Sequence, residues 1–317
     1  MSTNCTNITT SSPSGLEIIV FPILYIILCV FICGGNMLTI VAVCKTEVLR
    51  TIPNMFVVSL AIADLMIGGL VIPMQFLLYM PTLMDILDHS RIYCIFKYVT
   101  FTTSGTASVY FLMATAFDRA IYIGYSIHYE TIMSTFRAKV VILVGWLISL
   151  NAGFIPAYYN NWDSCPICHA FIFLKMEFQV YIQCVAFFIC FIIISVCYAT
   201  ILKIAAKQQK EILRLQIQEA KKMFEIEMKL VRMFMLVFGI FAICWTPNMI
   251  VLILKHLTNS VPRMMIHIVT PLCLLNSGMN FIVYAVKNPD FRRTFYKLMG
   301  FKNGRNSRIT PIINSPR

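Results

Sequence analysis

The most prominent pattern in the sequence is a series of long apolar runs, separated by short segments that are rich in charged or turn-forming residues. A helix needs about 20 predominantly apolar residues to cross the hydrocarbon core of a bilayer. The pattern therefore predicts seven membrane-spanning helices, which together use most of the chain. Their approximate bounds are Ile18 to Cys44, Ile52 to Met80, Tyr93 to Ile123, Ala138 to Tyr158, Met176 to Leu202, Leu230 to Leu254 and Met264 to Val286.

The composition agrees with a membrane protein. Of the 317 residues, 59% are hydrophobic and 13% are charged, whereas a soluble domain usually carries about 25% charged residues. We therefore expect one all-α membrane domain, a seven-transmembrane helix bundle, and not a set of soluble domains.

Lysine and arginine are distributed unequally between alternate loops. The loops on one side hold Lys45, Arg50, Arg137, Lys139, seven lysines and arginines between Lys203 and Lys229, and four between Lys287 and Lys297. The loops on the other side hold chiefly Arg91, Lys97, Lys175, Lys255 and Arg263. Cytoplasmic loops carry the excess of Lys and Arg, so the N-terminus is expected outside and the C-terminus in the cytosol. The net charge of +12 then faces anionic membrane lipid and does not form a nucleic-acid patch, because no soluble basic domain carries it.

The segment before the first apolar run supports the same orientation. It is polar and has no basic n-region, so the first span is expected to act as an uncleaved signal anchor. It contains two acceptor triplets for N-glycosylation, at Asn4 and Asn7, which can be used only on the lumenal side.

The twelve cysteines divide by predicted depth. Eight fall within apolar runs, where cysteine usually behaves as a small buried hydrophobe. Cys5, Cys94, Cys165 and Cys168 lie on the oxidising side. A bridge from Cys94 to Cys168, or to Cys165, would tie the loop after the fourth span over the mouth of the bundle. The CxxC spacing of Cys165 and Cys168 also suits metal or redox chemistry, which the lack of a second CxxC disfavours.

Polar residues inside the spans are costly in hydrocarbon and usually mark function. If these side chains lie close together in the folded protein, they offer one carboxylate, that of Asp64, and several neutral oxygens. Such a ligand set suits a small cation such as Na⁺. The alternative is hydrogen bonding between helices, worth about 0.6 kcal/mol per contact, and the spacing does not decide between the two. These residues are Asn36, Asp64, Ser108, Asn276 and Asn280.

Motifs in all seven spans, in order, resemble those of rhodopsin-like (class A) G-protein-coupled receptors. A short amphipathic eighth helix along the inner membrane surface is implied by "NPDFRRTFYKLM" at 288–299. The matching pieces are Gly35-Asn36, "SLAIADL" at 59–65, Cys94, Asp118-Arg119, Trp146, Tyr198, "CWTP" at 244–247 and "LNSGMNFIVY" at 275–284.

This resemblance implies roles for particular residues. Asp64, Ser108, Asn276 and Asn280 fall on the sodium pocket of the family. Arg119 matches the residue that pairs with an acid on the sixth helix in the resting state, and Glu227 stands where that acid is expected. Such a pair is a contact that can break when the helix moves and a G protein enters. The implied switch residues are Asp118, Arg119, Tyr198, Glu227, Trp245, Pro247 and Tyr284.

Three residues depart from the family pattern. Ala120 replaces the usual Tyr after Arg119, Phe281 replaces the usual Pro after Asn280, and Cys190 stands where a Pro is usual. Without that proline the seventh helix keeps a backbone donor, so it is expected to be straighter. These departures concern switching and not the fold.

The ligand pocket implied by the resemblance is apolar with a few neutral hydrogen-bonding groups. Phe101 occupies the position where amine receptors carry an Asp, and Leu274 the position of a retinal-binding Lys. We therefore expect an uncharged ligand of modest size. The pocket residues are Phe101, Thr102, Gly105, Thr106, Asn248, Met249, Leu252 and Thr270.

Within the family, the chain resembles adenosine receptors and their lipid-sensing relatives. The likeness rests on residues 58–73, on "YNNW" at 159–162 and on "FRRTFYKL" at 291–298. Leu252, however, stands where adenosine receptors place the Asn that holds the purine, which leaves adenosine-like and lipid-like ligands both open.

The resulting expectation is a plasma-membrane receptor, not an enzyme, that binds an extracellular small ligand and activates heterotrimeric G proteins. It needs no cofactor apart from an allosteric sodium ion. We expect a glycosylated extracellular segment at 1–17, the receptor domain at 18–286, the amphipathic helix at 287–300 and a cytosolic tail at 301–317. The alternative, a transporter or channel, is disfavoured because the spans show neither internal repeats nor a charged pathway.

Overall fold

The structure, a computed structural model, describes residues 15–216, 218–258 and 261–300. The predicted glycosylation acceptors Asn4 and Asn7 and the predicted tail at 301–317 lie outside the described residues.

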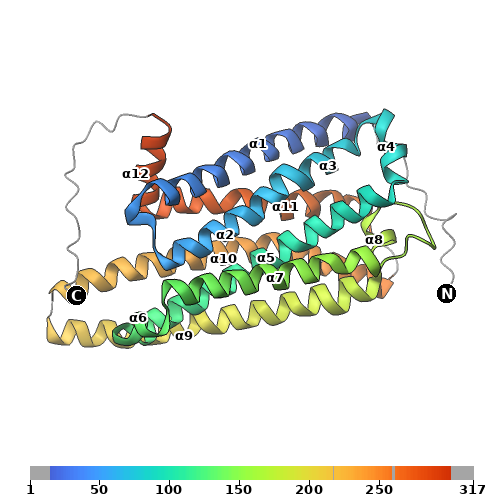
Figure 1. Cartoon of the computed structure of the whole chain (residues 1–317). Helices are drawn as coiled ribbons and strands as arrows, with labels where there is room; N and C mark the ends of the chain where they lie inside the picture. Colours follow the sequence, from blue (N-terminus) through green and yellow to red (C-terminus); the bar gives the residue numbers. More distant parts are fainter. Residues whose placement is uncertain (1–14, 217, 259–260, 301–317) are drawn as a thin grey trace.

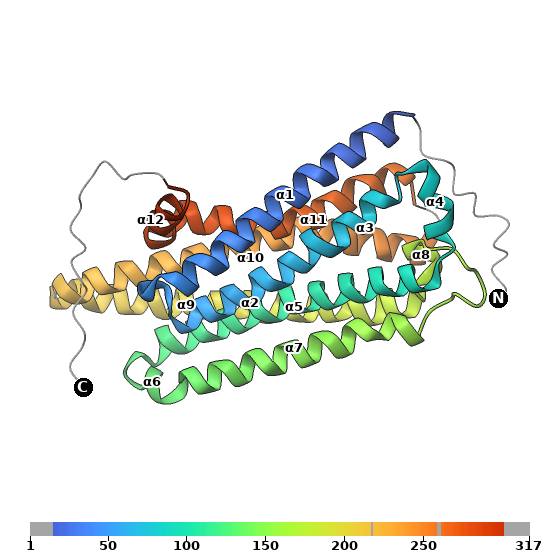
Figure 2. The same cartoon turned by 45° about the horizontal axis from the view of Figure 1, so that its top comes forward.

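Seven long helical segments lie side by side in one bundle (Figures 1 and 2). The described residues form no β-sheet, and a single isolated bridge joins Asn160 to Leu174. The predicted all-α bundle is therefore confirmed. The segments are α1 (Gly15–Lys45), α2 (Ile52–Met66) continued by the π turn η3 (Ile67–Val71) and α3 (Ile72–Leu77), α5 (Arg91–Gly124), α7 (Thr135–Tyr158), the π turn η5 (Phe178–Cys184) continued by α9 (Val185–Leu215), α10 (Gln218–Thr258) and α11 (Arg263–Lys287).

Among the described residues, six helices are long and apolar enough to cross a membrane. The exception is α5, the third predicted span, because many Ser and Thr residues lower its apolar content. It contacts α2, α7, α9 and α10, and this central place shields its polar side chains from lipid. The approach to α7 is close at Gly153, where a Cβ would collide with Thr103 of α5, as is usual for small residues between membrane helices.

The two ends of the bundle carry different short elements. We call the end with the Cys94–Cys168 bond the disulfide end and the end with the Arg119–Glu227 pair the ion-pair end. The disulfide end carries α4 (Pro81–Asp88) and α8 (Ala170–Phe173), and the ion-pair end carries η2 (Glu47–Leu49), η4 (Ser126–His128), α6 (Tyr129–Ile132) and α12 (Pro289–Leu298).

The second span is shorter than the sequence suggested. The apolar run continues to Met80, but the helix ends at Leu77 and Pro81 starts the separate helix α4. Proline is favoured in the first turn of a helix, where its missing N–H costs nothing, and it cannot continue a preceding helix without loss.

The amphipathic helix expected after the seventh span is α12, which turns away from the bundle axis (Figures 1 and 2). The side chain of Asn288 caps it by accepting from the backbone N–H of Asp290 at 2.9 Å. Phe291 and Phe295 are buried against the bundle, while the basic side chains of α12 are exposed.

Candidate functional site

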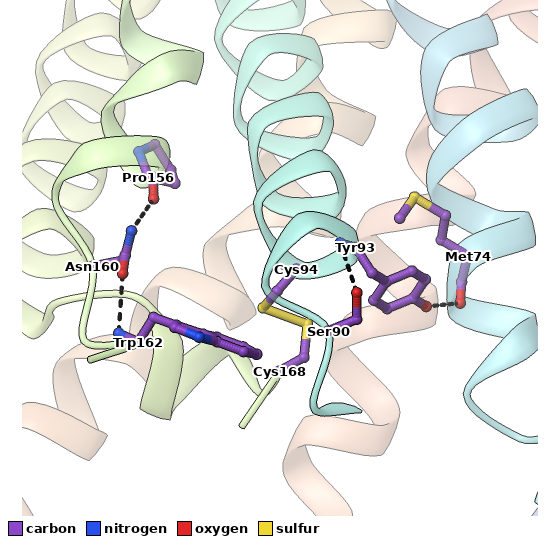
Figure 3. The surroundings of a disulfide bond; sticks show 8 residues. All are labelled: Met74, Ser90, Tyr93, Cys94, Pro156, Asn160, Trp162 and Cys168. Atoms are coloured by element: carbon purple, nitrogen blue, oxygen red, sulfur yellow. Dashed lines mark hydrogen bonds between the residues drawn. A yellow bond between two sulfur atoms is a disulfide. The ribbon is translucent and has the colours of Figure 1, made fainter. Parts of the chain in front are cut away.

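A disulfide joins Cys94, in the first turn of α5, to Cys168 in the loop after α7 (Figure 3). The sequence left Cys165 and Cys168 as alternatives; Cys168 is the partner of Cys94, and Cys165 is in a separate disulfide. The backbone N–H of Cys168 donates to the carbonyl of Asp88 at 2.8 Å. The loop is thus tied to both α5 and α4.

The "YNNW" segment shapes the same loop. Asn160 donates to the carbonyl of Pro156 at 2.9 Å and accepts from the backbone N–H of Trp162 at 3.0 Å. Trp162 points toward the disulfide (Figure 3). Asn160 therefore ends α7 and redirects the chain across the disulfide end.

Below this loop the bundle contains a cavity of about 490 Å³. It is walled by side chains from α3, α4, α5, η5, α10 and α11 together with the loop after α7. A volume of this order suits a small organic ligand. Four of the eight predicted pocket residues line it: Phe101, Asn248, Leu252 and Thr270.

The other four, Thr102, Gly105, Thr106 and Met249, are not among the residues that line this cavity, and their contact with a ligand stays a prediction. Gly105 instead faces Trp245, whose ring would lie 3.1 Å from a Cβ at that position. Met249 is buried, and its carbonyl accepts from the thiol of Cys184 on η5. Successive residues of a helix point about 100° apart, so Thr102 and Met249 can miss the cavity although their neighbours Phe101 and Asn248 line it.

Polar residues that the sequence analysis did not assign to the pocket also line it, including Lys97, Asp88, Gln75 and Gln183. Lys97 is a charge that the expectation of an uncharged ligand did not take into account. Burial raises the pKa of the Asp88 carboxyl, while Lys97 and His89 act in the opposite direction. The position of Lys97, one helical turn after Cys94, was the available signal in the sequence.

The predicted sodium ligands lie in the middle of the bundle. Asn280 of α11 donates to one oxygen of Asp64 of α2 at 2.7 Å. Among the residues that the structure describes, the other oxygen of Asp64 and the side-chain oxygen of Asn276 are buried and have no hydrogen-bond partner. Ser108 is also buried, and its hydroxyl donates to the carbonyl of Ser104 at 3.0 Å. Two unpaired buried oxygens, one of them on a carboxylate, fit a small hard cation.

Asn36 serves a different purpose from the rest of the polar set. Its side-chain amide donates to the carbonyls of Ile32 at 3.0 Å and Ser277 at 2.9 Å. It thereby joins α1 to α11, which is the helix-to-helix hydrogen bonding expected as the alternative role for these residues.

An aromatic cluster lies between the cavity and the centre of the bundle. The ring of Trp245 on α10 lies 5.9 Å from Phe101, which lines the cavity, and 5.8 Å from Phe241. Pro247, two residues beyond Trp245, lies inside α10, where it removes one backbone hydrogen bond and favours a kink. A ligand that contacts Phe101 would therefore be separated by one ring from Trp245, two residues before Pro247.

The ion-pair end contains a buried charge cluster. Arg119 binds Asp118 at 2.6 Å and Glu227 of α10 at 3.3 Å, and its guanidinium lies 4.9 Å from the centre of the Tyr122 ring. The hydroxyl of Tyr129 on α6 donates to the second oxygen of Asp118 at 2.7 Å, and burial together with this bond raises the pKa of Tyr129. The cluster joins α5, α6 and α10. Of the other predicted switch residues, the ring centre of Tyr198 lies 6.0 Å from that of Phe238, and the ring centre of Tyr284 lies 5.4 Å from that of Phe291.

Comparison with known proteins identifies the family. The family described as "7 transmembrane receptor (rhodopsin family)" matches residues 35–284, which is most of the chain. The chain belongs to this family. The receptor is similar to adenosine receptor A2b of Rattus norvegicus, with 28% identity over 295 residues that cover 84% of this chain and 85% of the relative. It is also similar to adenosine receptor A2b of Mus musculus (29% over 294 residues) and of Homo sapiens (28% over 294 residues), with the same coverage.

Family membership makes this protein a seven-transmembrane receptor and not an enzyme, and it makes it a multi-pass membrane protein. The structure shows the surroundings of two residues that depart from the family pattern, Ala120 and Phe281. Near Ala120, the ring of Tyr122, two residues later, lies against the guanidinium of Arg119. Phe281 lies in an unbroken stretch of α11 that continues to Lys287.

Proposed function

We propose that this receptor binds a small ligand in the cavity at the disulfide end and responds by activating a heterotrimeric G protein at the ion-pair end. The protein would lie in the plasma membrane with its N-terminus and disulfide end outside. This orientation is supported by the oxidising environment that a disulfide needs and by the excess of Lys and Arg on the opposite side.

One observation carries the proposal: a single helix, α10, connects the two ends. Asn248 and Leu252 of α10 line the cavity, Trp245 lies next to it, and Glu227 of the same helix holds Arg119. A ligand that changes the packing around Trp245 can therefore bias the Arg119–Glu227 contact. The surface that opens beside Arg119 is where a G protein would bind.

The ligand proposed here is adenosine-like or lipid-like, as the similarity to adenosine receptors and the apolar cavity suggest. Leu252 lines the cavity where an adenosine receptor is expected to present an Asn to the purine, so the structure lends more support to a lipid-like ligand. The size of the cavity and its apolar wall would suit a charged lipid-like ligand as well as an uncharged one.

The test uses purified receptor in lipid nanodiscs with a panel of purified heterotrimeric G proteins. We expect the receptor to accelerate nucleotide exchange on at least one heterotrimer, and we expect purines or lipids to change that rate. A Glu227→Gln receptor is included because loss of the ion pair should make basal exchange easier to detect. The proposal would be overturned if neither the unmodified receptor nor the Glu227→Gln receptor accelerated nucleotide exchange while solute moved across the membrane of receptor-containing vesicles. That result would support a transporter.

A further inference from the structure

A lysine side chain is buried in the wall of the cavity. Lys97 is 6% exposed, and it is the one Lys or Arg among the described residues that line the cavity. Removing an ammonium group from water is costly unless an anion or several acceptors surround it. The charge of Lys97 therefore needs a counter-charge.

The described part of the protein supplies little counter-charge for Lys97. Within residues 15–216, 218–258 and 261–300, Lys97 makes no ion pair within 4.0 Å and no hydrogen bond through its side chain is found. Its Nζ atom lies 5.4 Å from the centre of the Tyr98 ring, a contact weaker than a close ion pair.

Asp88 is the acid that shares the cavity with Lys97. It attracts Lys97 electrostatically, but burial raises the pKa of its carboxyl, which makes it a poorer counter-ion than an exposed aspartate. The backbone of Asp88 is held in place, because its carbonyl accepts a hydrogen bond from the backbone N–H of Cys168. Asp88 would also repel an anion that approached Lys97.

Much of the remaining wall is apolar and would hold the rest of the ligand. Phe101, Leu252 and Leu274 line the cavity from α5, α10 and α11. The wall thus carries one cation, the acid Asp88 and mostly apolar side chains, which suits at most one negative charge on an apolar body. A doubly charged phosphate would leave a negative charge without a partner.

We propose that the ligand of this receptor is an apolar molecule with one carboxylate, which forms an ion pair with Lys97 inside the cavity. This inference rests on the proposed function. This replaces the expectation of an uncharged ligand. Lys97 would supply a charge-assisted hydrogen bond, which is stronger than a hydrogen bond between neutral groups. The loop held by Cys94–Cys168 lies at the same end, and Cys168 itself lines the cavity.

The test measures equilibrium binding of tritiated probes to purified receptor in nanodiscs, with empty nanodiscs subtracted. The probes are straight-chain and aryl-substituted alkanoic acids, each compared with its own methyl ester and primary amide. We expect at least one acid to bind about tenfold or more tightly than its ester and amide. Lys97→Gln should remove that preference, and Lys97→Arg should keep most of it.

Two further variants separate this inference from loss of folding. Asp88→Asn removes a negative charge that would repel the carboxylate of the ligand. It should therefore strengthen binding of the same acid, an effect that misfolding cannot produce. Lys175→Gln is the matched control, because Lys175 lies 4.1 Å from the centre of the Tyr159 ring at the same end and is not among the cavity-lining residues. It should leave the preference for the acid unchanged.

The inference is overturned if no acid binds, if esters and amides bind as tightly as their acids, or if Lys97→Gln leaves the preference intact. Weaker acid binding in Asp88→Asn would also overturn it. The measurement contains no G protein. Lys97-dependent binding without nucleotide exchange therefore counts against the proposed function alone, and exchange without Lys97-dependent binding counts against this inference alone.

Discussion

Phe281 of α11 packs so closely on Gly35 of α1 that the glycine position has no room for a Cβ. Phe31, one turn before Gly35, meets the same ring edge-on, with centroids 5.0 Å apart. The family pattern has a proline at position 281, which would break the helix. In this receptor the large ring instead joins α1 to α11, and the missing side chain at Gly35 provides the space.

Gly35→Ala should destabilise the receptor, because the added methyl group must displace the Phe281 ring. Overpacking of this kind typically costs about 1–3 kcal/mol. The melting temperature of the purified protein measures the effect. Gly34→Ala is the matched control, since a Cβ there meets nothing within 4 Å, and it should leave the melting temperature unchanged or slightly raised.

A Phe281→Leu change should return part of the stability lost in Gly35→Ala. The smaller side chain makes room for the methyl group, so the two substitutions should be less destabilising together than the sum of each alone. Strict additivity of the two melting-temperature shifts would show that the residues do not interact as the structure indicates.

Glu227→Gln should raise basal nucleotide exchange. The substitution removes the charge that holds Arg119 at 3.3 Å. Glu227 is 18% exposed at its side chain, so the pair is partly screened, and a loss of about 1 kcal/mol would shift the equilibrium about fivefold toward the active state. Glu225→Gln is the control, because Glu225 is exposed on the same helix. Equal basal rates for Glu227→Gln and the unmodified receptor would argue against this ion pair as a restraint.

Asp64→Asn should abolish stabilisation by sodium. If Na⁺ binds the unpaired oxygens of Asp64 and Asn276, replacing choline by sodium at constant ionic strength should raise the melting temperature of the receptor. At a concentration about tenfold above Kd the gain is about 1.4 kcal/mol. Asp85→Asn is the control, since its side chain is exposed at the disulfide end. A sodium effect of equal size in Asp64→Asn would exclude this site.

The sequence predicted the features that depend on apolar runs and on rare polar residues. Seven runs gave seven helical segments, and Asp64 and Asn280, 216 residues apart, meet at 2.7 Å. Membrane helices are specified by composition over a whole turn or more, so an error of one residue does not alter the prediction.

Features that depend on the direction of a single side chain were not predictable. Cys165 and Cys168 lie on the same loop, and only the path of that loop makes Cys168 the partner of Cys94. Lys97 lies near the end of a span, where a lysine usually extends to the membrane surface, but packing turns it into the cavity. Neighbours such as Thr102 and Phe101 differ in facing because of helix rotation.

Tyr129→Phe should destabilise the ion-pair end. The Tyr129 hydroxyl donates to Asp118 at 2.7 Å, and Asp118 is fully buried, so the change leaves one carboxylate oxygen without this donor. Hydrogen bonds to charged groups contribute about 1.5–3 kcal/mol, which should appear as a lower melting temperature. Tyr125→Phe is the matched control, because Tyr125 is 63% exposed. If both variants melt at the temperature of the unmodified receptor, the bond from α6 does not stabilise the Asp118 carboxylate, and Arg119 alone holds it in place.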